Sequence, residues 1–170
     1  MENYILIGFS ASGKSTVGKI LAKKLKYDYV STDELVEKKV GTDTAVIIKN
    51  NGKDYFATIE KEIIQNLVSK KKLVIDIGSG GAVRNPNDVK KLGKIIFLKA
   101  DIKEIERRIL NAPYKRDYLI KIKRLAKSQI LTYIRDKMAK REPIYSKIAD
   151  LTIDTTNKTP KEIIEIILRK

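Results

Sequence analysis

The sequence predicts an α/β protein in which a parallel sheet of five strands lies between helices. Short apolar runs alternate with segments whose apolar residues recur at helical spacing, a pattern typical of a parallel sheet covered on both faces. Helix-start signals mark where the helical segments begin, and a glycine-containing loop joins the first strand to the first helix. A chain of 170 residues suffices for one such domain over 1–170.

The expected strands are short and apolar, at residues 4–9, 28–31, 73–77, 94–99 and 151–154. Capping-box spacing marks helix starts at Ser31, Asp101 and Thr159, each with a glutamate three residues later. Asn85-Pro86 opens a further helix. Residues 111–125 are polar and basic and contain Pro113, so we expect a mobile lid there.

Composition excludes several kinds of chemistry. The chain has no cysteine and no histidine, so proton transfer falls to carboxylates, lysines or tyrosines. The net charge is +15, and most of the excess lies between residues 99 and 147, which suits the handling of a triphosphate. Aromatic residues are thin in that basic run, so no nucleic-acid partner is expected. Without a leader-like N-terminus or a membrane-spanning apolar run, we expect a cytoplasmic location. We also expect a monomer.

The strongest motif is a G-x-x-x-x-G-K-S loop at residues 8–15, between an apolar strand and an amphipathic helix. Its glycines let backbone N–H groups turn around a phosphate, Lys14 brings positive charge, and the Ser15 hydroxyl is a ligand for Mg²⁺. The alternative, a chance glycine-rich turn, does not explain the strand and helix on either side. We therefore expect ATP to bind at Ser10, Ala11, Ser12, Gly13, Lys14, Ser15 and Thr16.

Two aspartates follow predicted strands. Asp76 ends Leu73-Val-Ile-Asp76, which has the form of a Walker B element; it either helps to hold Mg²⁺ or caps a backbone turn. Asp33 comes directly after the second strand; it either accepts the proton of an attacking hydroxyl or favours the first turn of a helix. Both readings stay open for each residue.

The other candidates are a glycine turn and several arginines. The run Gly78-Ser79-Gly80-Gly81 lets a ligand approach the backbone, although a tight strand-to-helix connection is the alternative. Arg84 lies just beyond this turn, and Arg141 lies near the end of a long helix. Three arginines flank the expected lid: Arg107, Arg108 and Arg116. An arginine there can stabilise the charge that develops in phosphoryl transfer, but position in the sequence does not show which of the three does so. The spacing of Tyr145 indicates packing.

Together these segments resemble the shikimate kinase family, which has a three-layer P-loop NTPase fold. The similarity follows the chain in order at residues 8–16, 32–33, 56–60, 79–83, 116–119 and 141–145. The resemblance implies ATP and Mg²⁺ at the loop and shikimate as acceptor. It implies Asp33 near the acceptor hydroxyl, Arg116 over the phosphates, and Arg107 or Arg108 near adenine. It also implies Arg141 on the substrate carboxylate.

Most departures of the sequence from the family fall on the acceptor side of the site, at Ser31, Ala57 and Ser79. Ser31 replaces an aspartate that supports Mg²⁺; elsewhere, Ala11 replaces a glycine of the loop and Asp117 replaces a proline of the lid. Asp76 is available to take over metal support.

On the acceptor side, Ala57 replaces an arginine that helps to clamp the carboxylate, and Ser79 replaces the first glycine of the turn. Arg84 and Lys61 are the nearest cations in the sequence and the candidates to replace the lost arginine.

The loop and its surroundings therefore predict an ATP-dependent phosphotransferase, and the resemblance implies that it converts shikimate to shikimate 3-phosphate. The alternatives are a related kinase for another polyol, sugar acid or nucleoside, and a nucleotide-binding protein that has lost catalysis. The expected catalytic residues are Lys14, Asp33 and Arg116, with Arg108 and Arg116 also binding ATP. Asp33, Ser79, Gly80, Gly81 and Arg141 are expected to bind the acceptor, and Ser15 and Asp76 the metal.

Overall fold

The computed structural model describes residues 2–112 and 126–169, apart from the side chains of residues 127 and 128. Of the lid expected at 111–125, only Asn111 and Ala112 fall within the described residues. The position of Arg116 lies outside them.

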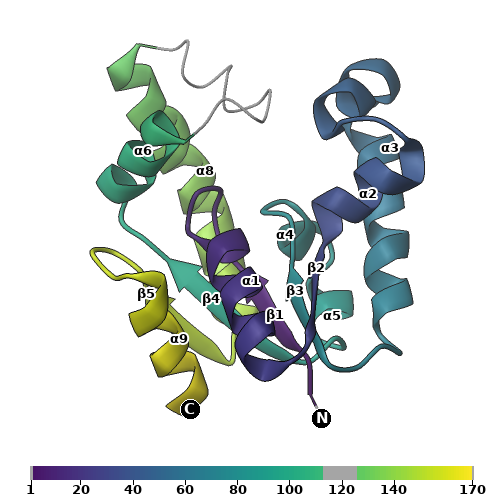
Figure 1. Ribbon diagram of the computed structural model, residues 1–170. Coiled ribbons are helices and arrows are strands. Elements are labelled where there is room, and N and C mark those ends of the chain that lie inside the picture. Colours follow the sequence, from purple (N-terminus) through teal and green to yellow (C-terminus); the bar gives the residue numbers. More distant parts are fainter. Residues whose placement is uncertain (1, 113–125, 170) are drawn as a thin grey trace.

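The predicted five-stranded sheet is confirmed, and every strand pair in it is parallel (Figure 1). The strands are β1 (Tyr4–Ile7), β2 (Asp28–Ser31), β3 (Leu73–Asp76), β4 (Lys94–Lys99) and β5 (Leu151–Asp154), in the order β2-β3-β1-β4-β5. Two strands end earlier than predicted. β1 stops at Ile7 because Gly8, with φ of 146°, turns the chain out of the sheet, and β3 stops at Asp76.

The helices begin largely where the capping signals predicted. They are α1 (Lys14–Leu25), α2 (Thr32–Val40), α3 (Thr44–Leu67), α4 (Gly81–Arg84), α5 (Pro86–Val89), α6 (Ile102–Asn111), α8 (Lys127–Ile148) and α9 (Pro160–Arg169). Ser31, Asp101 and Thr159 each accept a hydrogen bond from the backbone N–H three residues on. No helix within the described parts of the chain combines the length and the apolar character needed to cross a membrane.

Alternate residues of the central strands face two separate cores, which gives the fold its three layers. Ile5 and Ile7 pack with side chains of α2, α3, α5 and α8, whereas Leu6 packs with α1 and α9. A third cluster joins Phe9 of the loop to α6 and α8. Figure 1 shows α2 and α3 on one side of the strands' carboxyl ends, and α6 with part of α8 on the other. Ligands of parallel sheets bind at this edge, between the two pairs of helices.

Candidate active site

The loop between β1 and α1 has the backbone that phosphate binding requires. Gly8 and Gly13 have φ of 146° and 100°. A Cβ on Gly8 would lie 2.5 Å from the carbonyl oxygen of Leu98, so the close approach of β4 also demands glycine there. Ala11 adopts a left-handed conformation with φ of 63°, which glycine adopts without strain. The residue that departs from the family at this position therefore adopts a backbone conformation that favours glycine.

The side chains of the loop lie close to its backbone. Lys14 is buried, and its Nζ donates to the carbonyl oxygens of Gly8 and Phe9 at 3.1 and 3.2 Å, which holds the charge against the loop. Ser12 Oγ is buried without a hydrogen-bond partner among the described residues. Thr16 is exposed in the first turn of α1, where backbone N–H groups are available to an anion.

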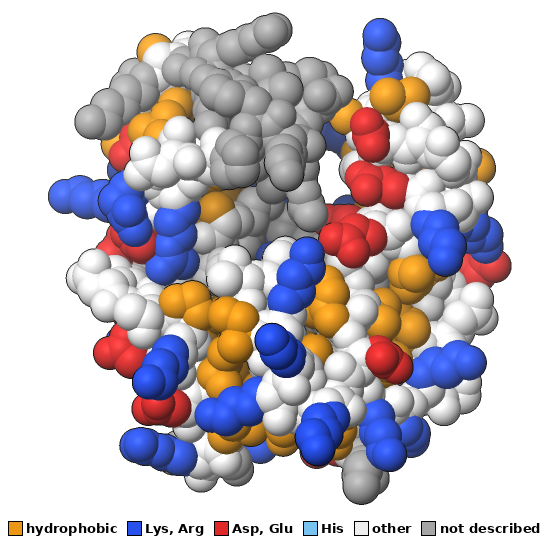
Figure 2. Space-filling view, viewed as in Figure 1, with side chains coloured by type: hydrophobic (Ala, Val, Ile, Leu, Met, Phe, Trp, Pro, Cys, Tyr) orange, Lys and Arg blue, Asp and Glu red, His pale blue; other side chains and the backbone are white. Residues whose placement is uncertain are grey.

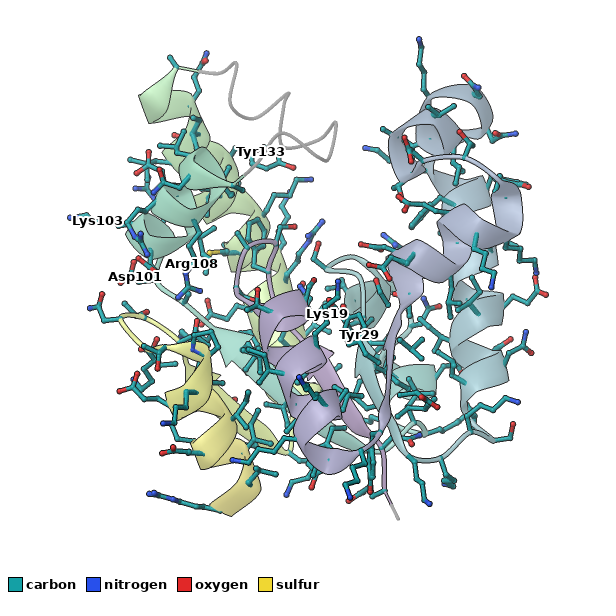
Figure 3. All side chains as sticks on the ribbon, viewed as in Figure 1. Lys19, Tyr29, Asp101, Lys103, Arg108 and Tyr133 are labelled. Atoms are coloured by element: carbon teal, nitrogen blue, oxygen red, sulfur yellow. The ribbon has the colours of Figure 1, made fainter. Side chains whose placement is uncertain are left out.

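Asp76 lies beside the loop serine. Its Oδ2 accepts from Ser15 Oγ at 2.6 Å and from the Tyr29 hydroxyl at 3.1 Å, while only 5% of the residue is exposed. These bonds join Asp76 to α1 and β2, and among the described residues no backbone N–H donates to its carboxylate. Lys19 lies over the Tyr29 ring, with Nζ 5.4 Å from its centroid, and Figure 3 shows the two side by side. Burial and the charge of Asp76 raise the pKa of Tyr29, so its hydroxyl stays protonated and donates.

The oxygens around Asp76 are of the type that Mg²⁺ prefers. Ser15 supplies a hydroxyl and Asp76 a carboxylate, and magnesium commonly binds one or two such groups with phosphate oxygens and waters. No group of three or more carboxylates that could hold a metal occurs within residues 2–112 and 126–169. The residues present therefore fit a magnesium ion carried with a triphosphate rather than a metal held by the protein alone.

Asp33 lies over the start of the glycine turn. Ser31 Oγ makes the capping bond of α2, and the Asp33 carboxylate instead approaches Gly78. A Cβ on Gly78 would lie 2.3 Å from Asp33 Oδ1 and 2.9 Å from Glu60 Oε1, so only glycine permits this approach. The structure thus brings Asp33 to the turn at the end of β3, beside a second carboxylate.

Ser79 connects the turn to the loop and to α8. Its Oγ lies 3.3 Å from Ser10 Oγ and accepts from Arg141 Nη1 at 3.0 Å. The Tyr145 hydroxyl donates to the Ser79 carbonyl oxygen. Tyr145 is 1% exposed, so it packs as predicted and also holds the turn, a role that its spacing did not reveal. Ser10, Ser79 and Arg141 therefore meet at one point between loop and turn.

Glu60 and Arg84 form an ion pair beside the same turn, between Arg84 Nη2 and Glu60 Oε2. Glu60 is fully buried, and its Oε1 has no hydrogen-bond partner among the described residues. Burial raises the pKa of Glu60, and the positive charge of Arg84 opposes that rise. Lys61, the other cation considered, is exposed on α3.

Arg108 contacts the phosphate loop from α6. Its Nη1 donates to the Ala11 carbonyl at 3.4 Å, and Nη2 donates to the Thr155 carbonyl at 2.8 Å. Figure 3 shows it pointing from α6 toward the segment between β5 and α9. Glu104 binds both neighbouring arginines, and hydrogen bonds from Arg107 and then Arg108 lower the pKa of Glu104 to about 2. Arg107 is 63% exposed, so Arg108 is the arginine of this pair that reaches the loop.

The described candidates therefore gather at one edge of the sheet. Figure 2 shows the molecular surface hollowed beside the side formed by α2 and α3. Sequence reasoning missed Tyr29 and the Glu60–Arg84 pair, because their partners lie on other strands and helices. The sequence of β2 places Tyr29 on a strand, but it does not show that the hydroxyl of Tyr29 will reach the carboxylate of Asp76 on β3.

Comparison with known proteins identifies the family. The shikimate kinase family model matches residues 10–170. Shikimate kinase of Thermodesulfovibrio yellowstonii is 36% identical over 172 residues, covering 100% of this chain and 95% of the relative. The enzyme of Caldanaerobacter subterraneus subsp. tengcongensis is 38% identical over 172 residues, covering 99% and 95%.

Solved structures agree with this assignment. Shikimate kinase from Acinetobacter baumannii, solved in complex with shikimate, superposes with a TM-score of 0.87 at 26% identity, covering 99% of this chain and 92% of the other. Shikimate kinase from Aquifex aeolicus gives a TM-score of 0.80 at 32% identity, covering 98% and 94%. The fold of almost the whole chain is thus shared with solved shikimate kinases, and this chain belongs to the shikimate kinase family.

Proposed function

We propose that this chain transfers the γ-phosphoryl group of ATP to a hydroxyl of shikimate, giving shikimate 3-phosphate and ADP. The observation that carries the proposal is the meeting of a phosphate loop with a cation-bearing turn, through Ser10, Ser79 and Arg141. A triphosphate on the loop and a small anionic acceptor on the turn would then lie side by side. Binding both reactants in this way supplies the proximity on which phosphoryl transfer depends.

On the nucleotide side, the loop residues 10–16 would hold the phosphates through backbone N–H groups. Lys14 would leave its carbonyl partners to neutralise charge on the outer phosphates. Arg108 would bind near the adenine, since its guanidinium already rests against the loop. We assign Arg116, outside the described residues, to the transferring phosphoryl group.

On the acceptor side, Asp33 would accept the proton of the attacking hydroxyl. The hydroxyl oxygen forms a bond to the γ-phosphorus as the bond from that phosphorus to the leaving oxygen of ADP breaks. The rest of the acceptor would be held by Arg141 and by the backbone of the turn at residues 79–81. The position of Asp33 over Gly78 supports this role.

Ser15 and Asp76 would hold Mg²⁺ as it arrives with ATP. The bound ion would neutralise charge on the β- and γ-phosphate oxygens. Tyr29 would keep Asp76 turned toward Ser15, since both hydroxyls share its Oδ2. We further propose that the chain forms one domain over 1–170 and acts as a monomer, which sedimentation tests.

An acceptor screen tests the proposed function. The purified chain is incubated with ATP, Mg²⁺ and single acceptors, and ADP release is followed by a coupled assay. The acceptors are shikimate, other small polyols, sugar acids and nucleosides. Turnover of shikimate at sub-millimolar to millimolar levels is the expected result. Activity on another acceptor without activity on shikimate would reject the proposed substrate and keep the kinase. ATP binding without transfer to any acceptor would reject both.

A further inference from the structure

We propose that Arg84 is a carboxylate-binding residue of the acceptor site, and that with Arg141 it forms a two-arginine clamp on the turn at Ser79 and Gly80. This inference rests on the proposed function, because it assigns the carboxylate of shikimate as the ligand. It selects Arg84 over Lys61 as the cation that compensates for Ala57.

The guanidinium groups of Arg141 and Arg84 contact two successive residues of the turn, Ser79 and Gly80 respectively. Arg141 Nη1 donates to Ser79 Oγ at 3.0 Å. A Cβ built on Gly80 would lie 2.3 Å from Arg84 Nη1 and 2.9 Å from both Cζ and Nη2, so this guanidinium rests directly on the Gly80 backbone. Both positive charges also act on the Tyr145 hydroxyl, opposing the burial that raises the pKa of Tyr145 to about 12. Both guanidiniums are therefore near the same buried group from α8.

Glu60 fixes Arg84 in place and leaves part of it available. Among the described residues, the Arg84 guanidinium has one hydrogen-bond partner, the buried Glu60 carboxylate. Its other N–H groups remain for a ligand, and 41% of its side chain is exposed. A guanidinium has five donors in a planar fork that suits a carboxylate. An arginine held on one side by a buried acid and open on the other is preorganised to bind an anion.

Ala57 lies on α3 one turn before Glu60. Residues three apart on a helix are neighbours on its surface, so an arginine at 57 would reach the same carboxylate that now binds Arg84. Lys61 has no such placement, since it is exposed and directly follows Glu60 on the helix. The acid on α3 thus binds a guanidinium that comes from α4 in this chain.

The test compares shikimate with its neutral carboxamide in steady-state kinetics and in calorimetric binding. Loss of a charged partner of a carboxylate weakens binding, and because Arg84 is partly exposed we expect Arg84→Ala to raise KM for shikimate about 10- to 100-fold. KM for ATP should change by less than about 2-fold. The carboxamide, which lacks the charge, should lose less than about 3-fold in binding.

Two further variants guard against misfolding and against an indirect effect. Arg84→Lys keeps a charge beside Glu60 and should raise KM by an intermediate factor, because an ammonium lacks the planar fork. Ala57→Arg combined with Arg84→Ala should recover most of the lost affinity. The control is Lys61→Ala, which removes one positive charge from α3 just as Arg84→Ala removes one from α4. It should leave KM for shikimate within about 2-fold of the unaltered chain.

Three outcomes would overturn the assignment: an unchanged KM in Arg84→Ala, an equal loss for shikimate and its carboxamide, or a fall in kcat alone. Any of these with normal turnover by the unaltered chain leaves the proposed function standing. An unaltered chain that neither binds nor phosphorylates shikimate overturns the proposed function, and the ligand assigned to Arg84 with it.

Discussion

Ser31 and Asp76 are direct partners across the ladder between β2 and β3. The resemblance to the family implies an aspartate supporting Mg²⁺ at the position of Ser31, and Asp76 is the next residue across the sheet. Its carboxylate hydrogen-bonds Ser15 of the phosphate loop at 2.6 Å. Because positions 31 and 76 are paired, a carboxylate at either one lies at the same edge of the sheet. An aspartate at 76 therefore places an acidic group near the loop although position 31 carries a serine.

Asp76→Asn should therefore weaken the use of magnesium while the fold survives. We expect the Mg²⁺ concentration for half-maximal rate to rise about 10- to 100-fold, as for other residues that support a metal. Titration of the initial rate with Mg²⁺, and calorimetric binding of Mg-ATP, measure it. Combining Ser31→Asp with Asp76→Ser should restore most of the affinity. Asp88→Asn on α5 is the control, and an equal effect there would contradict the assignment.

Tyr29→Phe isolates the hydroxyl that holds Asp76. The ring still packs on Gly18, so the main loss is the hydrogen bond at 3.1 Å, worth about 1 kcal/mol of unfolding free energy. The magnesium requirement should rise by a smaller factor than in Asp76→Asn. Urea unfolding and the same Mg²⁺ titration check both effects. Tyr27→Phe is a matched control, and the idea fails if both variants respond alike.

Asp33→Asn should lower kcat by about 10²- to 10⁴-fold, the usual contribution of a general base. Ser31 makes the cap of α2, so the melting temperature and KM for ATP should stay near those of the unaltered chain. Single-turnover rates and thermal unfolding give the two readouts. Glu34→Gln, in the same helical turn, controls for lost charge. A lower melting temperature with unchanged kcat would assign Asp33 to the helix alone.

The ion pairs of Glu104 should make the free energy of unfolding fall at acid pH. Hydrogen bonds from Arg107 and Arg108 lower the pKa of Glu104 from its ordinary 4.5 to about 2. A depressed folded-state pKa stabilises the protein above pH 4.5, and that contribution is lost as pH falls toward 2. Urea unfolding of Glu104→Gln should show lower stability at pH 7 and a smaller decline on acidification. Glu165→Gln on α9 should keep the full decline; equal profiles for all three proteins would refute the account.

Local sequence signals predicted much of the fold. Ser31, Asp101 and Thr159 each cap a helix as their spacing indicated, because a capping bond spans only three residues. The strands were also legible, since burial on both faces of a parallel sheet demands continuous apolar runs. The two misplaced strand ends lie where the chain turns into the functional loop and the glycine turn.

The acceptor side could not be read in the same way. Arg84 and Glu60 are 24 residues apart, and their contact depends on how α3 and α4 pack after the chain crosses the sheet. The spacing of Tyr145 showed that it is buried, but not that its hydroxyl would meet the Ser79 carbonyl. Contacts between elements decide these roles, so composition and periodicity alone left Arg84 and Lys61 as equal candidates.

The most direct test of the central claim is to identify the product formed from shikimate. Phosphorus NMR of a reaction with ATP, Mg²⁺ and shikimate should show one new phosphate monoester on the 3-hydroxyl for each ADP formed. Asp33→Asn should abolish that signal on the same timescale. ADP formation accompanied by inorganic phosphate alone, with shikimate unchanged, would contradict the account.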